Sequence, residues 1–214
     1  MDRRYPVSFE IAGSTALFAR PDGGSTPISY PVPTWSAVKG MFEAVARCHG
    51  AYLHPTHVEI CRPIRTTRYT TNYGGPLRKA EQIKKGNNLQ LIATVLFDVC
   101  YRVHGQAVAL EPGNGVNRAH ALQDIFQRRL AAGKLFYTPC LGWKEFTPSY
   151  FGPLRPESRA DTSVNLYIPS LLYSVFDAPV NGKWGPRFQR GVQVRHGVLE
   201  YTLQNDDTTG EPHA

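Results

Sequence analysis

The sequence contains few cysteines and no long apolar run. Its four cysteines, Cys48, Cys61, Cys100 and Cys140, lie too far apart for a C-x-x-C pair, so we expect buried thiols in a reducing compartment rather than a local zinc finger. No run of about eighteen apolar residues occurs, and the residues after Met1 lack the apolar core of a signal peptide. We therefore expect a cytoplasmic protein without a membrane segment, a metal or a cofactor.

Several catalytic motifs are also missing. The sequence has no P-loop, no G-x-S-x-G, no H-E-x-x-H and no pair of carboxylates at a catalytic spacing. Phosphoanhydride hydrolysis, acyl transfer and zinc-dependent hydrolysis therefore have no support in the sequence.

Positive charge is what the chain has in excess. It carries 24 Lys and Arg against 17 Asp and Glu, a formal net charge of +7, which favours polyanions and first of all nucleic acid. Most of the surplus lies in residues 62–85, where Glu81 is the sole anion beside Arg62, Arg65, Arg68, Arg78, Lys79, Lys84 and Lys85. Tyr69, Tyr73 and Gly74-Gly75 are interleaved with these cations, a mixture of phosphate-pairing groups and stacking faces that is typical of RNA binding. The alternative is a solvated loop without a ligand.

A second segment without acidic residues spans residues 183–195. It combines Lys183 and Arg187 with Trp184 and Phe188, so the two basic segments could form opposite banks of one groove. The alternative for the two aromatic residues is ordinary core packing beneath a loop.

Hydrophobic periodicity predicts the order of strands and helices. Period-two patterns predict strands at residues 5–13, 58–60 and 89–103. Helical spacing predicts one helix capped by Thr34 and another capped by Asn117, which Gly133 ends. With residues 135–137 as a last strand, the order is typical of an α+β fold, a ferredoxin-like or RNA-recognition-motif-like domain.

The final third of the chain predicts a smaller β-rich region. Strands are expected at residues 171–176, 192–194 and 198–201, with His196-Gly197 as a tight hairpin turn. We expect residues 1–150 to form the ferredoxin-like domain, with a basic insertion at residues 62–88. Residues 151–204 would then form a small β annex, and residues 205–214 a disordered tail.

One histidine has a context that suits catalysis. RNA carries its own nucleophile, the 2′-hydroxyl, so cleavage requires only a base and cations beside the phosphate. His120 lies near the start of the second predicted helix, where the helix dipole favours the neutral imidazole, and Arg118 is close to it in sequence. The alternative is a pair that caps the helix or contacts phosphate without catalysis.

Five segments together resemble a known family. They read YPVSFEIAG, SYPVPTWSAVKGMFEAV, RPI, FQRRLAAGKLFYTPCLGWKEF and GVLEY. They resemble the CRISPR-associated "Cas five" family of the RAMP superfamily, and most closely its subtype I-C (d) branch, over nearly the whole chain. The resemblance implies a ferredoxin-like domain with an extended basic β-hairpin and a small C-terminal β annex.

The resemblance also implies partners and an activity. Such proteins bind and cap the 5′ handle of a CRISPR RNA in the Cascade complex, beside a backbone subunit and a large subunit and away from any membrane. In this branch the protein also cuts the repeat of the precursor RNA without metal. The branch's catalytic tyrosine and Lys-His pair align without gaps to Ala46, Ala121 and Leu122, so the activity is left open.

Three hypotheses follow. The first is a Cascade subunit of antiviral defence that binds CRISPR RNA through Lys39, Arg62, Arg65, Arg68, Tyr69, Tyr73, Arg78, Lys79, Lys84, Lys85, Arg128, Arg129, Lys183 and Arg187. The second is an active endoribonuclease with His120 as base, Arg118 as phosphate clamp and Tyr52 or Tyr30 as a second proton-transfer group. The third is a general RNA-binding protein.

Overall fold

The computed structural model describes residues 4–73, 79–85, 89–110, 117–176 and 183–202. Arg78, the Gly74-Gly75 pair and the predicted tail lie outside the described residues, and the side chain of Tyr73 is likewise not described. The elements are β1 (Pro6–Ala16), η1 (Pro21–Gly23), α1 (Trp35–Val45), β2 (Ala51–Ile60), β3 (Thr66–Tyr73), α2 (Ala80–Lys84), β4 (Leu89–Ala109), α3 (Arg118–Ala131), β5 (Tyr150–Gly152), β6 (Leu166–Ser174), β7 (Arg187–Arg195) and β8 (Val198–Glu200). None of the described helices is long and apolar enough to cross a membrane.

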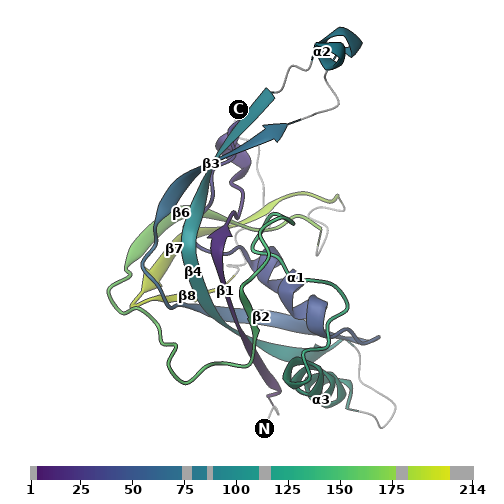
Figure 1. Ribbon diagram of the computed structural model, residues 1–214. Helices are drawn as coiled ribbons and strands as arrows, with labels where there is room; N and C mark the ends of the chain where they lie inside the picture. Colours follow the sequence, from purple (N-terminus) through teal and green to yellow (C-terminus); the bar gives the residue numbers. More distant parts are fainter. Residues whose placement is uncertain (1–3, 74–78, 86–88, 111–116, 177–182, 203–214) are drawn as a thin grey trace.

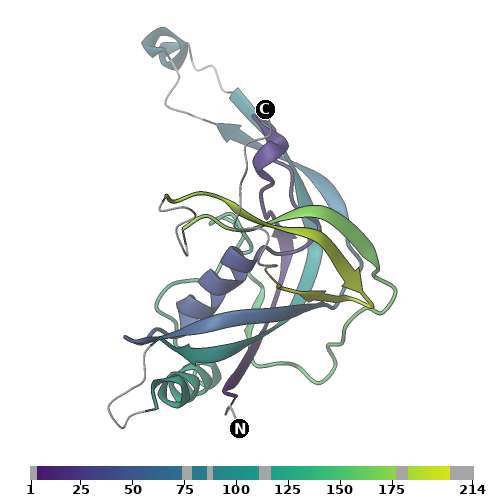
Figure 2. The same ribbon diagram turned by 180° about the vertical axis from the view of Figure 1, so that it is seen from behind.

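The described strands form a curved antiparallel sheet. Their order is β5-β1-β4-β2-β8-β7-β6, and β3 pairs with the first part of β4. Figures 1 and 2 show the sheet bending around α1, so that β6 and β7 pass along the other side of this helix. The rings of Trp35 in α1 and Tyr173 in β6 stack with their centroids 4.5 Å apart and close this half-barrel. The mixed α and β class predicted from the sequence is confirmed.

The core lies between the sheet and the two long helices. Val7, Phe9 and Ile11 alternate along β1 and are buried. The ring of Phe42 in α1 lies 4.9 Å from that of Phe9 and 5.6 Å from that of Phe126 in α3. Both helices therefore pack on the same face of the sheet, and each fully buried side chain of this kind contributes about 1.5–3 kcal/mol.

Both predicted helix starts are confirmed. Thr34 Oγ1 accepts a hydrogen bond from the backbone N–H of Ala37, at 3.3 Å, and Asn117 Oδ1 accepts one from that of His120, at 3.0 Å. These bonds satisfy amide groups that have no partner within the first turn of a helix. The helices could be located from sequence because their start signals are local.

The strand predicted at residues 135–137 is wrong. These residues form an irregular segment with exposed side chains, and the edge position beside β1 is taken by β5. The backbone N–H of Phe136 donates a hydrogen bond to the carbonyl of Ala44, and the hydroxyl of Tyr137 donates one to the carbonyl of Gly40. These two bonds hold the segment against α1, and the one to Ala44 satisfies a carbonyl group in the last turn of the helix.

The long strand β4 extends beyond its predicted end. The pattern predicted residues 89–103, whereas the strand continues to Ala109. Its first part pairs with β3, and its remainder lies between β1 and β2. At the junction, Asp98 has a left-handed φ of 55°, and its carboxylate is ion-paired with Arg62. Aspartate tolerates this conformation better than most residues, so Asp98 marks the point where the hairpin leaves the body of the sheet.

The C-terminal strands continue the main sheet. The predicted turn at His196-Gly197 is confirmed, with φ angles of 49° and 77°, and it joins β7 to β8. The strand predicted at residues 171–176 begins earlier, at Leu166. Because β8 pairs with β2, strands β6 to β8 extend the sheet of the first half. The division of the chain into domains stays a prediction.

On the sheet face opposite α1 and α3, a carboxylate is buried. Glu10 of β1 has no exposed surface and accepts hydrogen bonds from the backbone N–H and the Nε of Arg155, at 2.9 and 2.7 Å, and from Ser158 Oγ at 2.8 Å. Burial raises the pKa of Glu10, but the hydrogen bonds from Arg155 and Ser158 outweigh it, so the pKa lies below its usual value. The Cys100 thiol also contacts Glu10.

All four cysteines are free, and Cys100 is buried whereas the other three are only half-buried.

Candidate nucleic-acid interface

The β3-β4 hairpin carries most of the predicted basic segment. It projects from one end of the molecule with α2 at its tip, and α3 lies at the opposite end (Figures 1 and 2). The structure places on this projection Arg65, Arg68, Lys79, Lys84 and Lys85, all of them exposed. The cations of this one segment thus share one projection rather than being scattered over the surface.

Within this hairpin the cations differ in their partners. Arg62 is ion-paired with Asp98 at the base. Among the described residues, no carboxylate forms an ion pair with Arg65, Arg68, Lys84 or Lys85. Their charge is therefore available to an external anion, whereas that of Arg62 is already compensated.

The two faces of the hairpin differ in chemistry. Arg68 is paired with Thr94 in the ladder and Tyr69 with Ala93, so their side chains point to opposite faces. Tyr69 is half-buried, and its ring meets that of Phe146 edge-on at 5.2 Å. Tyr69 therefore anchors the hairpin to the body, while Arg68 lies on the exposed face.

A second cluster, which we call the arginine-aromatic patch, consists of Arg47, Arg129, Phe136 and Tyr137. The guanidinium of Arg129 lies 4.0 Å from the centroid of the Phe136 ring and that of Arg47 lies 5.4 Å from Tyr137. Arg129 also donates to the carbonyl of Val45 at 2.6 Å. Phe136 is 56% exposed. The sequence predicts Arg129 and its exposed neighbour Arg128 as site residues, but not Arg47, Phe136 and Tyr137, because these join Arg129 only through contacts between distant parts of the chain.

The predicted catalytic pair lies at the start of α3 without mutual contact. Arg118 Nη1 donates to the carbonyl of His49 at 2.8 Å. His120 is largely exposed, with its Nδ1 3.6 Å from a carboxylate oxygen of Asp124 and its ring 5.7 Å from that of Tyr5. No described contact connects either residue to Tyr52 or Tyr30. Burial raises the pKa of Tyr30, and the Tyr30 hydroxyl accepts a hydrogen bond from the backbone N–H of Leu172.

The three positions that align with the family's catalytic groups form no reactive cluster. Leu122 is fully buried in the core, and Ala46 is buried at the end of α1. Ala121 is half-buried and carries no reactive group. A side chain at position 122 points into the core, whereas His120 is exposed near the start of α3.

The remaining predicted cations lie between α1 and the ends of β6 and β7. Lys39 is ion-paired with Glu43 at 3.2 Å, and its ammonium lies 5.9 Å from the ring centroid of Trp35. Arg187 contacts Ser174, and its guanidinium lies 5.5 Å from the Tyr173 ring. Lys183 is exposed. Lys39 and Arg187 thus each contact one ring of the Trp35-Tyr173 stack, and the groove between the two basic segments stays a prediction.

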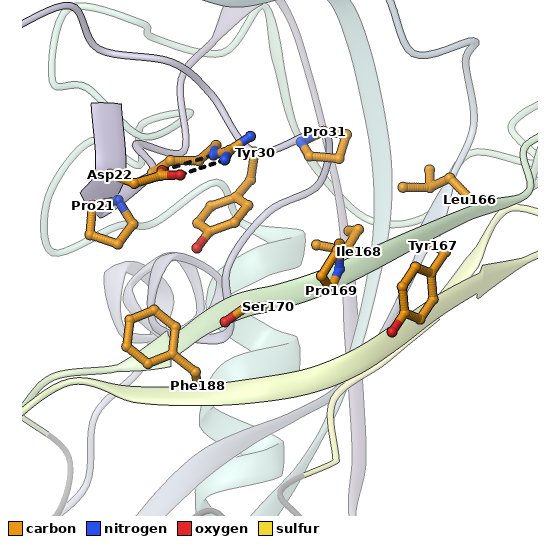
Figure 3. A pocket seen from close by; sticks show the side chains of 11 residues that line it. Pro21, Asp22, Tyr30, Pro31, Leu166, Tyr167, Ile168, Pro169, Ser170 and Phe188 are labelled. Atoms are coloured by element: carbon orange, nitrogen blue, oxygen red, sulfur yellow. Dashed lines mark hydrogen bonds and ion pairs between the residues drawn. The ribbon is translucent and has the colours of Figure 1, made fainter. Parts of the chain in front are cut away.

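A cavity of about 450 Å³ lies at the foot of the hairpin, between η1 and β6. Figure 3 shows Tyr30 and Phe188 at one end of it and Tyr167 further along β6. The segment before Tyr30 is tied to β4, because Thr94 exchanges backbone hydrogen bonds with Pro27 and Ser29. The predictions included Tyr30 but missed the cavity, since its walls come from separate parts of the chain.

Comparisons with known proteins give consistent results. The model of the family described as CRISPR-associated protein (Cas_Cas5), in its Cas5d form, matches residues 7–210. The CRISPR pre-crRNA endoribonuclease Cas5d of Thermus thermophilus is 29% identical over 183 residues, covering 79% of this chain and 72% of that protein. The protein of the same name from Mannheimia succiniciproducens is 26% identical over 215 residues, covering 91% and 93%.

Solved structures show the same fold. A crystal structure of a CRISPR-associated protein gives a TM-score of 0.69 at 18% identity, with 95% of each chain covered. A functionally uncharacterized protein from Streptococcus mutans gives 0.67 at 18% identity and 94% coverage of each chain. A chain of a CRISPR RNA-guided surveillance complex gives 0.51 at 15% identity and 91% coverage of each. The family model spans nearly the whole chain, and the protein therefore belongs to the CRISPR-associated Cas5 family, in its subtype I-C Cas5d group.

Proposed function

We propose that the protein binds and caps the 5′ repeat handle of a CRISPR RNA as a subunit of Cascade in antiviral defence. The observation that carries the proposal is the projecting hairpin, whose exposed cations Arg65, Arg68, Lys84 and Lys85 have no ion-pair partner among the described residues. A strand of phosphates is the ligand that matches such a row of positive charge. Membership of the Cas5 family supports CRISPR RNA as the source of that strand.

The architecture supports a finer description of the fold. Four strands lie side by side in the sheet in the order β5-β1-β4-β2. Along the chain, α1 follows β1 and α3 follows β4. This arrangement supports a ferredoxin-like domain, in which β3 and α2 would be an insertion between β2 and β4. We infer that residues 1–150 form that domain and residues 151–204 an annex that lengthens its sheet. A cytoplasmic location, and contacts with the backbone and large subunits of Cascade, belong to the same proposal.

The test of specificity is a comparison of two RNAs of equal length and charge. One carries the repeat handle encoded beside the protein's own CRISPR array, and the other carries the same bases in scrambled order. We expect the handle to bind at least about 10-fold more tightly, which corresponds to about 1.4 kcal/mol. Filter binding at a fixed salt concentration measures the ratio. Equal affinities would contradict the proposal and support a general RNA-binding protein.

The second candidate function is cleavage of the precursor RNA, the activity that both similar Cas5d proteins carry in their names. The exposed imidazole of His120 favours it. The buried Leu122 and Ala46 oppose it, since they leave no Lys-His pair or tyrosine in register.

We expect a repeat hairpin to remain intact when it is incubated with the purified protein in EDTA. Denaturing electrophoresis of the RNA measures the result. Cleavage that is lost in His120→Ala but kept in His196→Asn would instead establish the endoribonuclease. His196 is a suitable control because it is exposed in a turn, and asparagine tolerates its left-handed φ.

A further inference from the structure

Two histidines and a glutamate meet on the outer face of the sheet. In the β2-β4 ladder His57 is paired with His104, and Glu59 with Arg102. Paired residues of an antiparallel ladder project to the same face. Val58 and Val103, the pair between them, are fully buried against the helices, so the histidines and Glu59 project to the opposite face. The three side chains thus come from neighbouring strands and converge on one spot.

The three side chains bring their ligand atoms close together. The imidazoles of His57 and His104 are stacked with their centroids 4.3 Å apart and their planes 5° apart. Glu59 Oε1 lies 2.9 Å from His104 Nε2. One ligand atom from each residue lies within 4.8 Å of the others. Because the lone pair of an imidazole nitrogen lies in the plane of its ring and Zn²⁺ binds at about 2.0–2.2 Å, the two rings must turn out of their parallel planes to share one ion.

Neighbouring groups orient these ligands. The hydroxyl of Thr56 donates its one proton to the backbone carbonyl of His104, at 3.1 Å. The same oxygen lies 3.1 Å from His57 Nδ1, so in that contact it accepts a hydrogen bond. The proton of His57 is thereby placed on Nδ1, and the lone pair of Nε2 is left for a ligand. Arg102 Nη1 donates to the second carboxylate oxygen of Glu59 at 2.8 Å and fixes its plane. Contacts of this kind hold the ligands of metal sites in place.

One ring nitrogen of the cluster faces the carboxylate directly. His104 Nε2 is buried, and Glu59 Oε1 lies 2.9 Å from it in an orientation that is poor for a hydrogen bond. A metal ion between His104 and Glu59 would satisfy both atoms at once.

We propose that His57, Glu59 and His104 bind one divalent ion of the borderline class, with Zn²⁺ as the occupant. Two imidazoles and one carboxylate form a donor set that zinc accepts, whereas Mg²⁺ and Ca²⁺ prefer oxygen ligands alone. The fourth position is open to water. The ion would connect β2 to β4 beside the β-bulge between Pro55 and His57, and this role is independent of RNA binding.

Zinc titration of the untagged protein tests the site. Calorimetry should give one Zn²⁺ per chain, and Co²⁺ in its place should show the visible absorption of a tetrahedral site. We expect His104→Ala to weaken zinc binding by about 100-fold and Thr56→Val, which removes the orienting hydroxyl, by about 10- to 100-fold. His196→Asn, which removes an exposed histidine elsewhere, should bind zinc as the unmodified protein does.

The test also separates loss of the site from loss of the fold. Circular dichroism establishes whether each variant is folded, and Glu59→Gln replaces His104→Ala if that variant is not. At one fixed concentration, Zn²⁺ should raise the melting temperature of the unmodified protein more than that of the folded site variants. Absence of binding, or equal zinc affinities in the unmodified protein and in His104→Ala or Glu59→Gln, would overturn the proposal. None of these measurements involves RNA, so their outcome is independent of the RNA-binding proposal.

Discussion

Replacing Arg155 with alanine is expected to destabilise the protein by about 3–5 kcal/mol at neutral pH. The reason is Glu10, which is fully buried and depends on Arg155 for its countercharge and for side-chain hydrogen bonds. Ser158 and Cys100 remain as partners in the variant, but neither carries positive charge. The carboxylate would then be a buried charge without compensation, which costs far more than the loss of a surface ion pair.

The effect should depend on pH in a defined direction. In the unmodified protein the pKa of Glu10 is lower in the folded state than in the unfolded state, where it is about 4.3. The ionised carboxylate therefore contributes its full stabilisation at pH values above about 4.3, and this stabilisation is lost as the pH falls through the folded-state pKa. In Arg155→Ala, burial acts on Glu10 without the guanidinium, and protonation relieves the buried charge. The stability difference between the two proteins should therefore shrink as the pH falls toward about 4.

Urea unfolding at several pH values measures both effects. Arg159→Ala is the matched control, because Arg159 is an exposed arginine of the same loop. The double variant Glu10→Leu/Arg155→Ala removes the charge together with its partner and should recover part of the lost stability. A destabilisation below about 1 kcal/mol in Arg155→Ala would show that Glu10 does not depend on the guanidinium.

The double variant Arg65→Gln/Arg68→Gln is expected to weaken binding of the handle RNA by about 10-fold or more. Both side chains are exposed on the hairpin without an acidic partner among the described residues, so glutamine should leave the fold intact while it removes two phosphate contacts. Each contact with single-stranded RNA contributes about 0.7 to the slope of log K against log salt, so the slope should fall in magnitude by about 1.4.

Binding measured between low and high salt provides both numbers. The control is Arg4→Gln/Arg159→Gln, which removes the same charge at exposed positions outside both basic segments. If the two double variants lose affinity equally, the hairpin acts only through net charge and is not the site. If neither changes the slope, the proposed interface is wrong.

Features of the fold could be predicted from the sequence where neighbouring residues alone determine them. Thr34 and Asn117 mark helix starts by their own side chains, and the basic segment at residues 62–85 is visible in composition alone. The pairing of Arg155 with Glu10 could not be predicted, because a period-two pattern shows which face a residue takes and not what covers that face. The pattern of β1 placed Glu10 on the polar face, and residues distant in sequence then buried it.

The same limit applies to the candidate sites. His57 and His104 become neighbours only through the register of β2 against β4, which no local pattern encodes. A last strand at residues 135–137 completes the predicted order of elements, yet in the fold these residues donate hydrogen bonds to carbonyl groups of α1. The cavity at the foot of the hairpin is likewise assembled from η1, Tyr30 and β6.

The continuity of β4 has a mechanical consequence. One strand runs from within the projecting hairpin through Asp98 into the centre of the sheet, between β1 and β2. When an attached RNA is pulled along that axis, tension reaches the hydrogen bonds to both neighbours in shear, so many of them must rupture together. We therefore expect the RNA to dissociate from the hairpin before the hydrogen bonds of β4 break.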